Sequence, residues 1–255
     1  MATINVMGRW TQESGWNAIE AAGATMLIAN PPILEEVLAE SGKRGKIPGR
    51  LRMSLSGGGP VPPTLKQGWR DKLKTPLVES YGQSELGGFV ALGYPEIEED
   101  DGALMRVGPP LPDKEVAIFD LQDKAQPVEV VGEIVVTGGF MKGYWGKPEK
   151  TRETTRGGWL HTGDIGFIDR DGYVLMRGRK SELIDVAGVS WYPRDVEEAL
   201  CRQSGIRQAA VIGLADKVLG QRPAAFVIVQ DGQKVSPEGL KQAIQPEVPY
   251  DIETL

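Results

Sequence analysis

The sequence predicts an α/β fold: a mostly parallel sheet with helices, then a small β unit, then a small α+β domain. Apolar runs with the length of buried strands alternate with helical patterns over residues 13–80, which is typical of βαβ units and a parallel sheet. From about residue 103 short strands follow one another without helices, which favours an antiparallel or barrel-like unit. After residue 178 helical and strand patterns mix again, as in an α+β domain.

In the first part of the chain, prolines and apolar spacing define the expected elements. Trp16, Ile19 and Ala22 are spaced as on one face of a helix, and two Pro-Pro pairs stand where first-turn prolines open helices. We expect helices over 13–22 and from the pairs at 31–32 and 62–63, and strands over 25–29, 51–55 and 77–80. Ligands of parallel sheets bind beyond the carboxyl ends of strands. The candidate site therefore lies in two loops that follow strands, 56–60 (SGGGP) and 81–85 (YGQSE).

The later parts have their own pattern. An acidic stretch at 96–102 predicts an exposed loop, and strands are expected over 116–119, 133–137, 159–161 and 173–176. A hairpin joins 165–168 to 173–176, because Asp171-Gly172 suits a tight turn with positive φ. A helix opens at Pro193, two strands cover 208–214 and 224–229, and Ser236 is the N-cap of a last helix.

Composition limits the classes of function. The 255 residues include 29 basic and 35 acidic ones, and the net charge of −6 argues against the electrostatic footprint of a nucleic-acid-binding protein. Cys201 and His161 are the single cysteine and histidine, so a Cys/His metal cluster is excluded, and Cys201 is interpreted as a small buried hydrophobe. No run resembles a signal peptide or a membrane-spanning segment. The expected compartment is therefore a reducing cytoplasm.

An acid and a base flank the hairpin. Asp164 follows a Thr-Gly pair at a strand end, and its carboxylate could accept hydrogen bonds from two neighbouring hydroxyl groups, such as those of a ribose. Arg179 stands beside Gly178 on the other side of the hairpin. Such a pair can converge on one small polar ligand.

The stretch 157–188 resembles the adenylate-forming superfamily of acyl- and aryl-CoA ligases, luciferases and peptide-synthetase adenylation domains. The family has a run similar to W-x-x-TGD-x-G-x-x-D-x-x-G-Y-x-x-x-x-GR-x-K/D-[DE]-x-I. The residues of this chain in register with it are Trp159, Thr162, Gly163, Asp164, Gly166, Asp169, Gly172, Tyr173, Gly178, Arg179, Glu182 and Ile184. A second stretch, 81–85, resembles the family's YG-x-[ST]-E.

The resemblance implies a nucleotide site. Tyr81 would stack on adenine beside Gly82, Ser84 would approach the α-phosphate, and Glu85 would bind Mg²⁺, for which a carboxylate is a suitable hard ligand. Asp164 and Arg179 would hold the ribose. The loop glycines would flank adenine and the acyl chain, and the room they leave favours a fatty acid over a small acid; these are Gly57, Gly58 and Gly59.

Other family motifs are interpreted as hinge, thiol-binding or structural. The hinge of the family, usually Asp or Lys, is Ser181 here, which leaves domain alternation without its charge pairs. Ala187 and Gly188 occupy the loop that presents backbone to CoA. Stretches similar to GE-[IL]-x-[IV]-x-G at 132–138 and to GYW-x-x-PE-x-T at 143–151 are taken as structural. His161, which precedes the Thr-Gly-Asp run, is expected to pack or hydrogen-bond rather than act as a general base.

The resemblance covers only the later portion of a family member. The phosphate loop ending in Pro-Lys-Gly does not occur in residues 1–255, and the catalytic lysine expected after Pro249 would lie beyond Leu255, so no catalytic residue is assigned. The expected domains are 1–178, with the barrel-like unit at about 103–178, a hinge at 179–182 and an incomplete domain at 183–255. We expect the isolated chain to be inactive and either to self-associate or to need a missing N-terminal half.

The function implied is that of a fragment of an ATP-dependent carboxylate–CoA ligase. Such an enzyme makes acyl-AMP and pyrophosphate from a carboxylic acid and ATP, then acyl-CoA and AMP. Its cofactors would be ATP/AMP, Mg²⁺ and CoA. Two alternatives remain open: an adenylation module that loads a carrier protein, and a non-catalytic protein that binds adenine nucleotides or a partner chain.

Overall fold

The structure, a computed structural model, describes residues 3–94, 105–246 and 253–254. These residues fall into two compact units, one drawn from Met1–Val116, Val136–Leu160 and Ile168–Leu175, the other from Ala117–Val135, His161–Phe167 and Met176–Leu255. The loop expected at 96–102 and the segment around Pro249 lie outside the described residues. The domain boundary expected at 179–182 stays a prediction.

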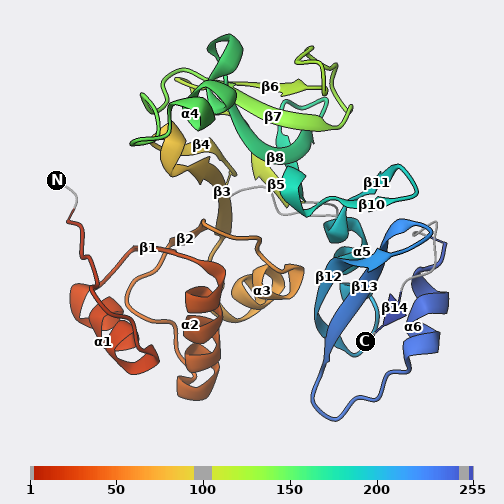
Figure 1. Cartoon of the computed structure of the whole chain (residues 1–255). Helices are drawn as coiled ribbons and strands as arrows, with labels where there is room; N and C mark the ends of the chain where they lie inside the picture. The colour runs from red at the N-terminus through yellow and green to blue at the C-terminus, as the bar shows by residue number, and fades with distance from the viewer. Residues whose placement is uncertain (1–2, 95–104, 247–252, 255) are drawn as a thin grey trace. The chain divides into compact units, whose positions relative to one another are not determined.

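The N-terminal part of the first unit contains a four-stranded sheet and the helices α1, α2 and α3 (Figure 1). Its strand order is β1-β2-β3-β4, with parallel pairing from β1 to β3 and an antiparallel pair of β3 with β4. The strand–helix alternation of the sequence is confirmed. The bounds are α1 Gln12–Ala22, β1 Met26–Ala29, α2 Pro31–Arg44, β2 Met53–Ser56, α3 Pro63–Gly68, β3 Leu77–Gln83 and β4 Gly88–Leu92.

Local sequence signals explain where these helices begin. Thr11 caps α1 in a capping box with Ser14, and the Asn30 side chain accepts a hydrogen bond from the backbone N–H of Ile33 at the start of α2. α3 begins at a proline and passes into a π-helical turn, Trp69–Leu73. The helix predicted there as one regular element is thus two shorter ones. Trp69 and Leu73 are nevertheless both fully buried, as the apolar spacing predicts.

The core of this unit lies between the helices and one face of the sheet. It is built from Ile19, Leu34, Val37, Leu51, Val61, Leu65, Trp69 and Leu73, and Leu27 and Ala29 of β1 pack against it. The other residues of β1 point away from this core, and Met26 is 47% and Ile28 60% exposed. β1 is therefore an edge strand with an open apolar face.

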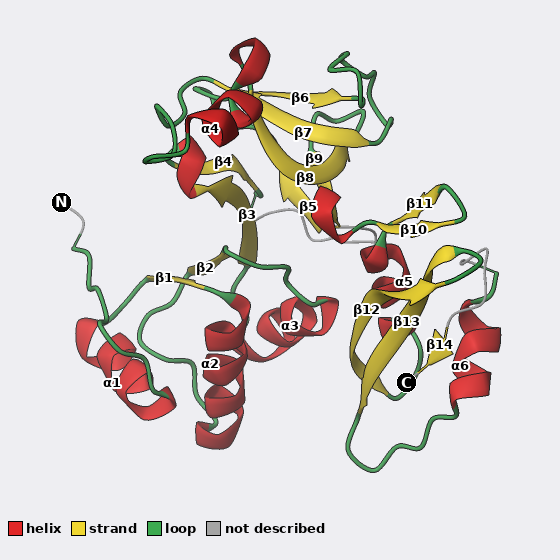
Figure 2. Cartoon of the chain, in the orientation of Figure 1, coloured by secondary structure: helices red, strands yellow, loops and turns green. Residues whose placement is uncertain are grey.

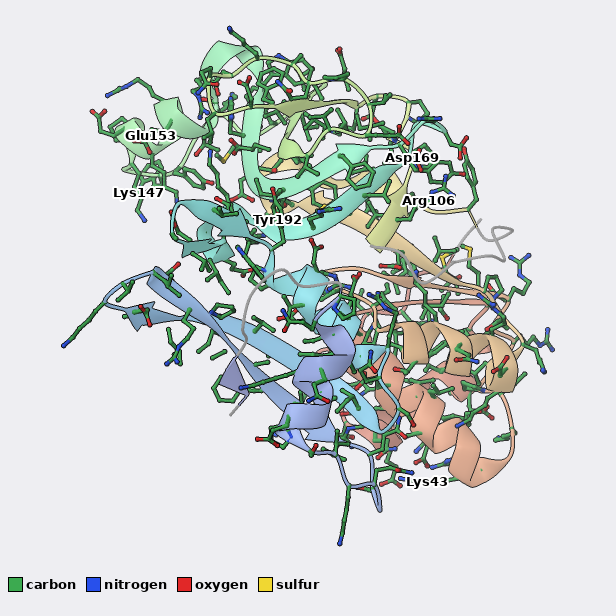
Figure 3. The ribbon with its side chains drawn as sticks, turned by 90° about the vertical axis from the view of Figure 1, so that its right-hand side faces the viewer. Lys43, Arg106, Lys147, Glu153, Asp169 and Tyr192 are labelled. Atoms are coloured by element: carbon green, nitrogen blue, oxygen red, sulfur yellow. The ribbon has the colours of Figure 1, made fainter. Side chains whose placement is uncertain are left out.

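A five-stranded sheet follows, in the order β5-β9-β8-β7-β6. The predicted hairpin is confirmed: Asp169 N–H donates to the Tyr173 carbonyl and Gly172 N–H to the Asp169 carbonyl at 3.0 Å each. Arg106 stabilises the turn, because its guanidinium lies 2.9 Å from Asp169 (Figure 3). The same guanidinium lies 2.9 Å from Asp171 and stacks on the Tyr173 ring. The strands are β5 Met105–Gly108, β6 Glu115–Phe119, β7 Gly132–Thr137, β8 Leu160–Ile168 and β9 Val174–Arg179.

The second unit contains the predicted α+β part, in which helices α5 and α6 accompany one sheet (Figure 2). The sheet order is β11-β10-β13-β12, with β14 beside β13. A core under α5 includes Val196, Ala199 and Leu200, and half-buried Cys201 packs against it. Burial raises the pKa of the Cys201 thiol, in keeping with a packing role. The bounds are β10 Ile184–Val186, β11 Val189–Trp191, α5 Pro193–Cys201, β12 Ile206–Asp216, β13 Gly220–Val229, α6 Pro237–Ile244 and β14 Glu253–Thr254.

Several short elements escape sequence analysis. These are β4, β5, the β10–β11 hairpin and α4, Pro148–Thr154. Each of these strands and this helix has seven residues or fewer, so its apolar pattern is too brief to be distinguished from a loop. Within the described ranges, no helix is both long and apolar enough to cross a membrane.

Candidate active site

The structure brings together the acid and the base that flank the β8–β9 hairpin. Asp164 lies in β8 and Arg179 ends β9, and the guanidinium Nε is 3.2 Å from the carboxylate Oδ1. The Asp164 side chain is only 3% exposed, whereas that of Arg179 is 55% exposed. Since the carboxylate accepts and the guanidinium donates hydrogen bonds, two adjacent hydroxyl groups of a ligand could bond to both.

The backbone before Asp164 is fixed to the neighbouring strand β7. Gly163 has a φ of +71°, a conformation that favours glycine, and its N–H donates to Glu133 Oε1 at 3.1 Å. The Thr162 hydroxyl donates to the Ile134 carbonyl at 2.6 Å and accepts from the Asp164 N–H at 3.0 Å. The Thr-Gly-Asp run thus lies within β8, not at the strand end that the sequence predicts, and its hydrogen bonds hold Asp164 in one place.

Glu133 is the buried centre of this network. Its Oε2 accepts a hydrogen bond from the ammonium of Lys180 at 3.1 Å and lies 3.4 Å from His161 Nδ1. Burial acts to raise the pKa of the Glu133 carboxyl, but Lys180 and His161 more than offset it and the pKa lies below its usual value. His161 is 7% exposed and packs edge-on against Phe119, which agrees with a packing and hydrogen-bonding role.

The glycine-rich loop and the end of β3 surround a cavity of ≈ 510 Å³ in the first unit. Three of the predicted site residues, Gly58, Gly82 and Ser84, line it, together with Ser80, Gln83, Gly87, Gly88 and Phe89. The Ser80 hydroxyl donates to the Ser56 carbonyl at 2.8 Å, and a Cβ at Gly57 would lie 2.8 Å from that hydroxyl oxygen. A side chain at 57 would therefore disturb the hydrogen bond between Ser80 of β3 and Ser56 of β2.

The stretch 81–85 is less of a loop than the sequence predicts. Tyr81 and Gly82 belong to β3 and pair with Ala91 and Phe89 of β4, with a bulge between them. The prediction is wrong here because β4, too short to be recognised, supplies a partner strand. Tyr81 is 7% exposed, and the aromatic residue on the cavity wall is Phe89, 41% exposed. Gly87 and Gly88, directly before Phe89, are the feature of the sequence that marks this part of the cavity wall.

Glu85 lies in a 3₁₀ turn, Ser84–Leu86, that is tied to the segment before α4. The Tyr144 hydroxyl donates to Glu85 Oε1 at 2.9 Å, and the Met141 N–H donates to the Glu85 carbonyl at 2.7 Å. Burial and the nearby Glu85 carboxylate raise the pKa of Tyr144. Lys114 also connects this turn to the segment after β7, because its ammonium donates to the carbonyls of Leu86, Gly138 and Gly139. The GYW stretch thus orients the predicted metal ligand.

The predicted hinge and thiol-binding loop lie in the second unit. Ser181 is exposed in a 3₁₀ turn, Lys180–Glu182. Ala187 and Gly188 form the two-residue turn of the β10–β11 hairpin, with φ of +53° and +82°. The Gly188 N–H donates to Asp185 Oδ1 at 2.7 Å, so a side chain of the same hairpin stabilises this turn.

Family models match most of the chain. One, described as AMP-binding enzyme, matches residues 2–145, and another, the AMP-binding enzyme C-terminal domain, matches 195–253. The chain is 33% identical to a fatty acid–[acyl-carrier-protein] ligase, ScoC, of Streptomyces coeruleorubidus, over 96% of this chain and 48% of that protein. It is 36% identical to a 2-succinylbenzoate–CoA ligase of Geobacillus sp. (strain WCH70), over 95% of this chain and 49% of that protein.

Solved structures agree with these matches. The amide bond synthetase McbA of Marinactinospora thermotolerans superposes with a TM-score of 0.87 at 31% identity, over 98% of this chain and 51% of that one. The o-succinylbenzoate CoA synthetase MenE of Bacillus subtilis, in complex with its acyl-adenylate OSB-AMP, gives 0.80 at 28% identity, over 97% and 50%. The chain spans about half the length of these relatives and matches their later portion, which confirms the predicted fold class. It belongs to the adenylate-forming, AMP-binding enzymes.

Proposed function

We propose that this chain supplies the nucleotide-holding part of the active site of an ATP-dependent carboxylate–CoA ligase. The whole enzyme activates a carboxylic acid as its acyl-AMP with release of pyrophosphate, then passes the acyl group to the CoA thiol. The observation that carries the proposal is the Asp164–Arg179 pair, 3.2 Å apart at the open end of the β8–β9 hairpin. In this proposal the carboxylate accepts from the ribose hydroxyls and the guanidinium donates to one of them.

Other residues take the roles that their motifs imply. Tyr81 stacks on adenine, Ser84 meets the α-phosphate, and the glycine loop at 57–59 flanks adenine and the acyl chain. Ser181 is the hinge, and the Ala187-Gly188 turn presents backbone to the thiol substrate. The cavity that Gly58, Gly82 and Ser84 line supports the roles of the glycine loop and of Ser84; the other roles rest on the motifs alone.

Glu85 suits a magnesium ion held largely by phosphate and water. In the described part of the chain, no group of three or more His, Cys, Asp or Glu side chains could hold a metal. Mg²⁺ commonly takes one or two protein carboxylates and completes its shell with water and substrate phosphates. Glu85 fits this requirement because Tyr144 orients its carboxylate while leaving one oxygen to a ligand. When bound, the ion would neutralise phosphate charge.

Substrate and acceptor are the finer points of the proposal. The three glycines favour a fatty acid, and two relatives are named as fatty acid ligases, ScoC and a long-chain-fatty-acid–CoA ligase. ScoC is named for an acyl-carrier protein, which keeps carrier-protein loading as the alternative to CoA. A non-catalytic nucleotide-binding protein is the remaining alternative.

Calorimetric titration of the 255-residue chain with AMP tests the ribose assignment. Asp164→Asn removes the charge from two possible hydrogen bonds, so AMP affinity should fall at least about tenfold, since such bonds contribute roughly 1.5–3 kcal/mol each. Asp231→Asn, at an exposed position of the same unit, is the matched control and should bind as the parent does. Equal binding by the parent and Asp164→Asn would show that the ribose lies elsewhere.

Pyrophosphate release tests the activity of the chain by itself. The phosphate loop and the catalytic lysine of the family do not occur in residues 1–255, so we expect no turnover with fatty or aromatic acids. Turnover at an ordinary enzymatic rate, about 1–10³ s⁻¹, would contradict this. If turnover occurs, product analysis with CoA and with a carrier protein separates the two acceptors.

A further inference from the structure

One buried carboxylate contacts the sequence neighbours of both ribose-site residues. Glu133 Oε1 accepts from the N–H of Gly163, the residue before Asp164. Glu133 Oε2 accepts from the ammonium of Lys180, the residue after Arg179. These two bonds, of 3.1 Å each, thus attach Glu133 to the residue before Asp164 and to the residue after Arg179.

Sheet order explains how one side chain reaches both positions. β8 lies between β7 and β9 in the sheet, and Glu133 is on β7. Its bond to Gly163 joins adjacent strands, whereas the Lys180 side chain crosses β8 from the end of β9. The Glu133 side chain is 8% and that of Lys180 42% exposed, so one end of this ion pair is screened from water. A charge-assisted bond in that setting restricts the backbone more than an exposed one does.

We propose that Glu133 is a positioning residue for the nucleotide site: it fixes the Asp164 carboxylate and the Arg179 guanidinium in the orientation that a ribose needs. The proposal rests on the proposed function and goes beyond it, because the motif that contains Glu133 is interpreted from sequence as structural. Adjacent residues share a peptide unit, so holding Gly163 and Lys180 restricts the directions of the side chains beside them. Binding then requires less ordering of the pair.

Two substitutions separate the two bonds. Glu133→Gln keeps a carbonyl oxygen that can accept from the Gly163 N–H, but loses the charge that holds Lys180. Lys180→Met removes the same ion pair from its partly exposed end, which protects the test from a failure of Glu133→Gln to fold. Lys217→Met, at an exposed position of the same unit, is the control for the loss of a lysine.

AMP titration of the 255-residue chain measures the effect, on variants that keep a cooperative thermal transition. We expect Glu133→Gln and Lys180→Met each to weaken AMP binding about tenfold, and the double variant no further, because one ion pair is lost in all three. Lys217→Met should bind as the parent does. In an Asp164→Asn background, Glu133→Gln should have a smaller effect than in the parent, because the part of its effect that acts through the Asp164 carboxylate is already lost.

Three results would overturn the proposal. One is folded Glu133→Gln and Lys180→Met variants that bind AMP as tightly as the parent. Another is an effect of Glu133→Gln that adds fully to that of Asp164→Asn, since a merely structural role predicts independence. If the parent chain does not bind AMP, the proposed function fails for this chain. In that case the exchange rate of the Arg179 Nε proton, measured by NMR, tests the positioning role without AMP. The rate should rise about tenfold in Glu133→Gln, and an unchanged rate is the third result that would refute the proposal.

Discussion

Replacing Gly82 by alanine should force strands β3 and β4 apart. A Cβ built on Gly82 would lie 2.0 Å from the Gly88 carbonyl oxygen, 2.7 Å from its carbon and 2.8 Å from the Cα of Phe89. All three atoms are backbone, so no side chain can rotate away. Ordinary contact begins at 3.4 Å, and β4 must therefore retreat by about 1.4 Å.

The magnitude follows from what this retreat disrupts. The bulge between Tyr81 and Gly82 already leaves the ladder irregular, and the displaced bonds are those that pair Gly82 with Phe89. Overpacking against rigid neighbours costs typically about 1–3 kcal/mol, and we expect about 3 kcal/mol here because backbone must move. Gly58→Ala is the control: its φ of +78° strains an alanine by about 1 kcal/mol, but no atom lies within 4 Å of the new Cβ.

Urea unfolding followed by tryptophan fluorescence measures both variants. The signal reports mainly on the first unit, which contains five of the six tryptophans. At an unchanged slope, the midpoint of Gly82→Ala should fall well below that of Gly58→Ala. If Gly82→Ala loses no more stability than Gly58→Ala, the close approach of Gly88 is not what requires glycine at 82.

Three further predictions concern stability and association. Ala187→Gly should raise the free energy of unfolding by about 0.5 kcal/mol, since φ is +53° there, and thermal unfolding checks it. The pKa of Glu133 lies below 4.5 in the folded chain, so the stability that the ionised carboxylate contributes is complete above pH 4.5 and is lost as the pH falls through the lowered value. The urea midpoints of the parent and Glu133→Gln should therefore differ at neutral pH and converge in acid. The chain should self-associate through the edge strand β1, and Ile28→Lys should reduce light scattering at micromolar concentration. A monomeric parent chain would contradict the last of these.

The sequence by itself determined the features that depend on near neighbours in the chain. The Asp-Gly turn places β9 beside β8, and the convergence of Asp164 and Arg179 follows because one hairpin carries both. Helix starts at Pro31 and Ser236 also follow from local chemistry. The family motifs lie in these same local stretches, which is why the fold class could be predicted.

Only the tertiary structure decided which distant groups hold the candidate site in place. Glu133 is 30 residues from Gly163 and 47 from Lys180, and Glu85 is 59 residues from Tyr144. Such contacts depend on strand order and register, which local periodicity does not specify. The same holds for Gly82, whose small size suggests room for a ligand but which is required by the backbone of β4. A hairpin can be predicted from its own residues, but the neighbours that fix its side chains are set by the packing of the whole sheet.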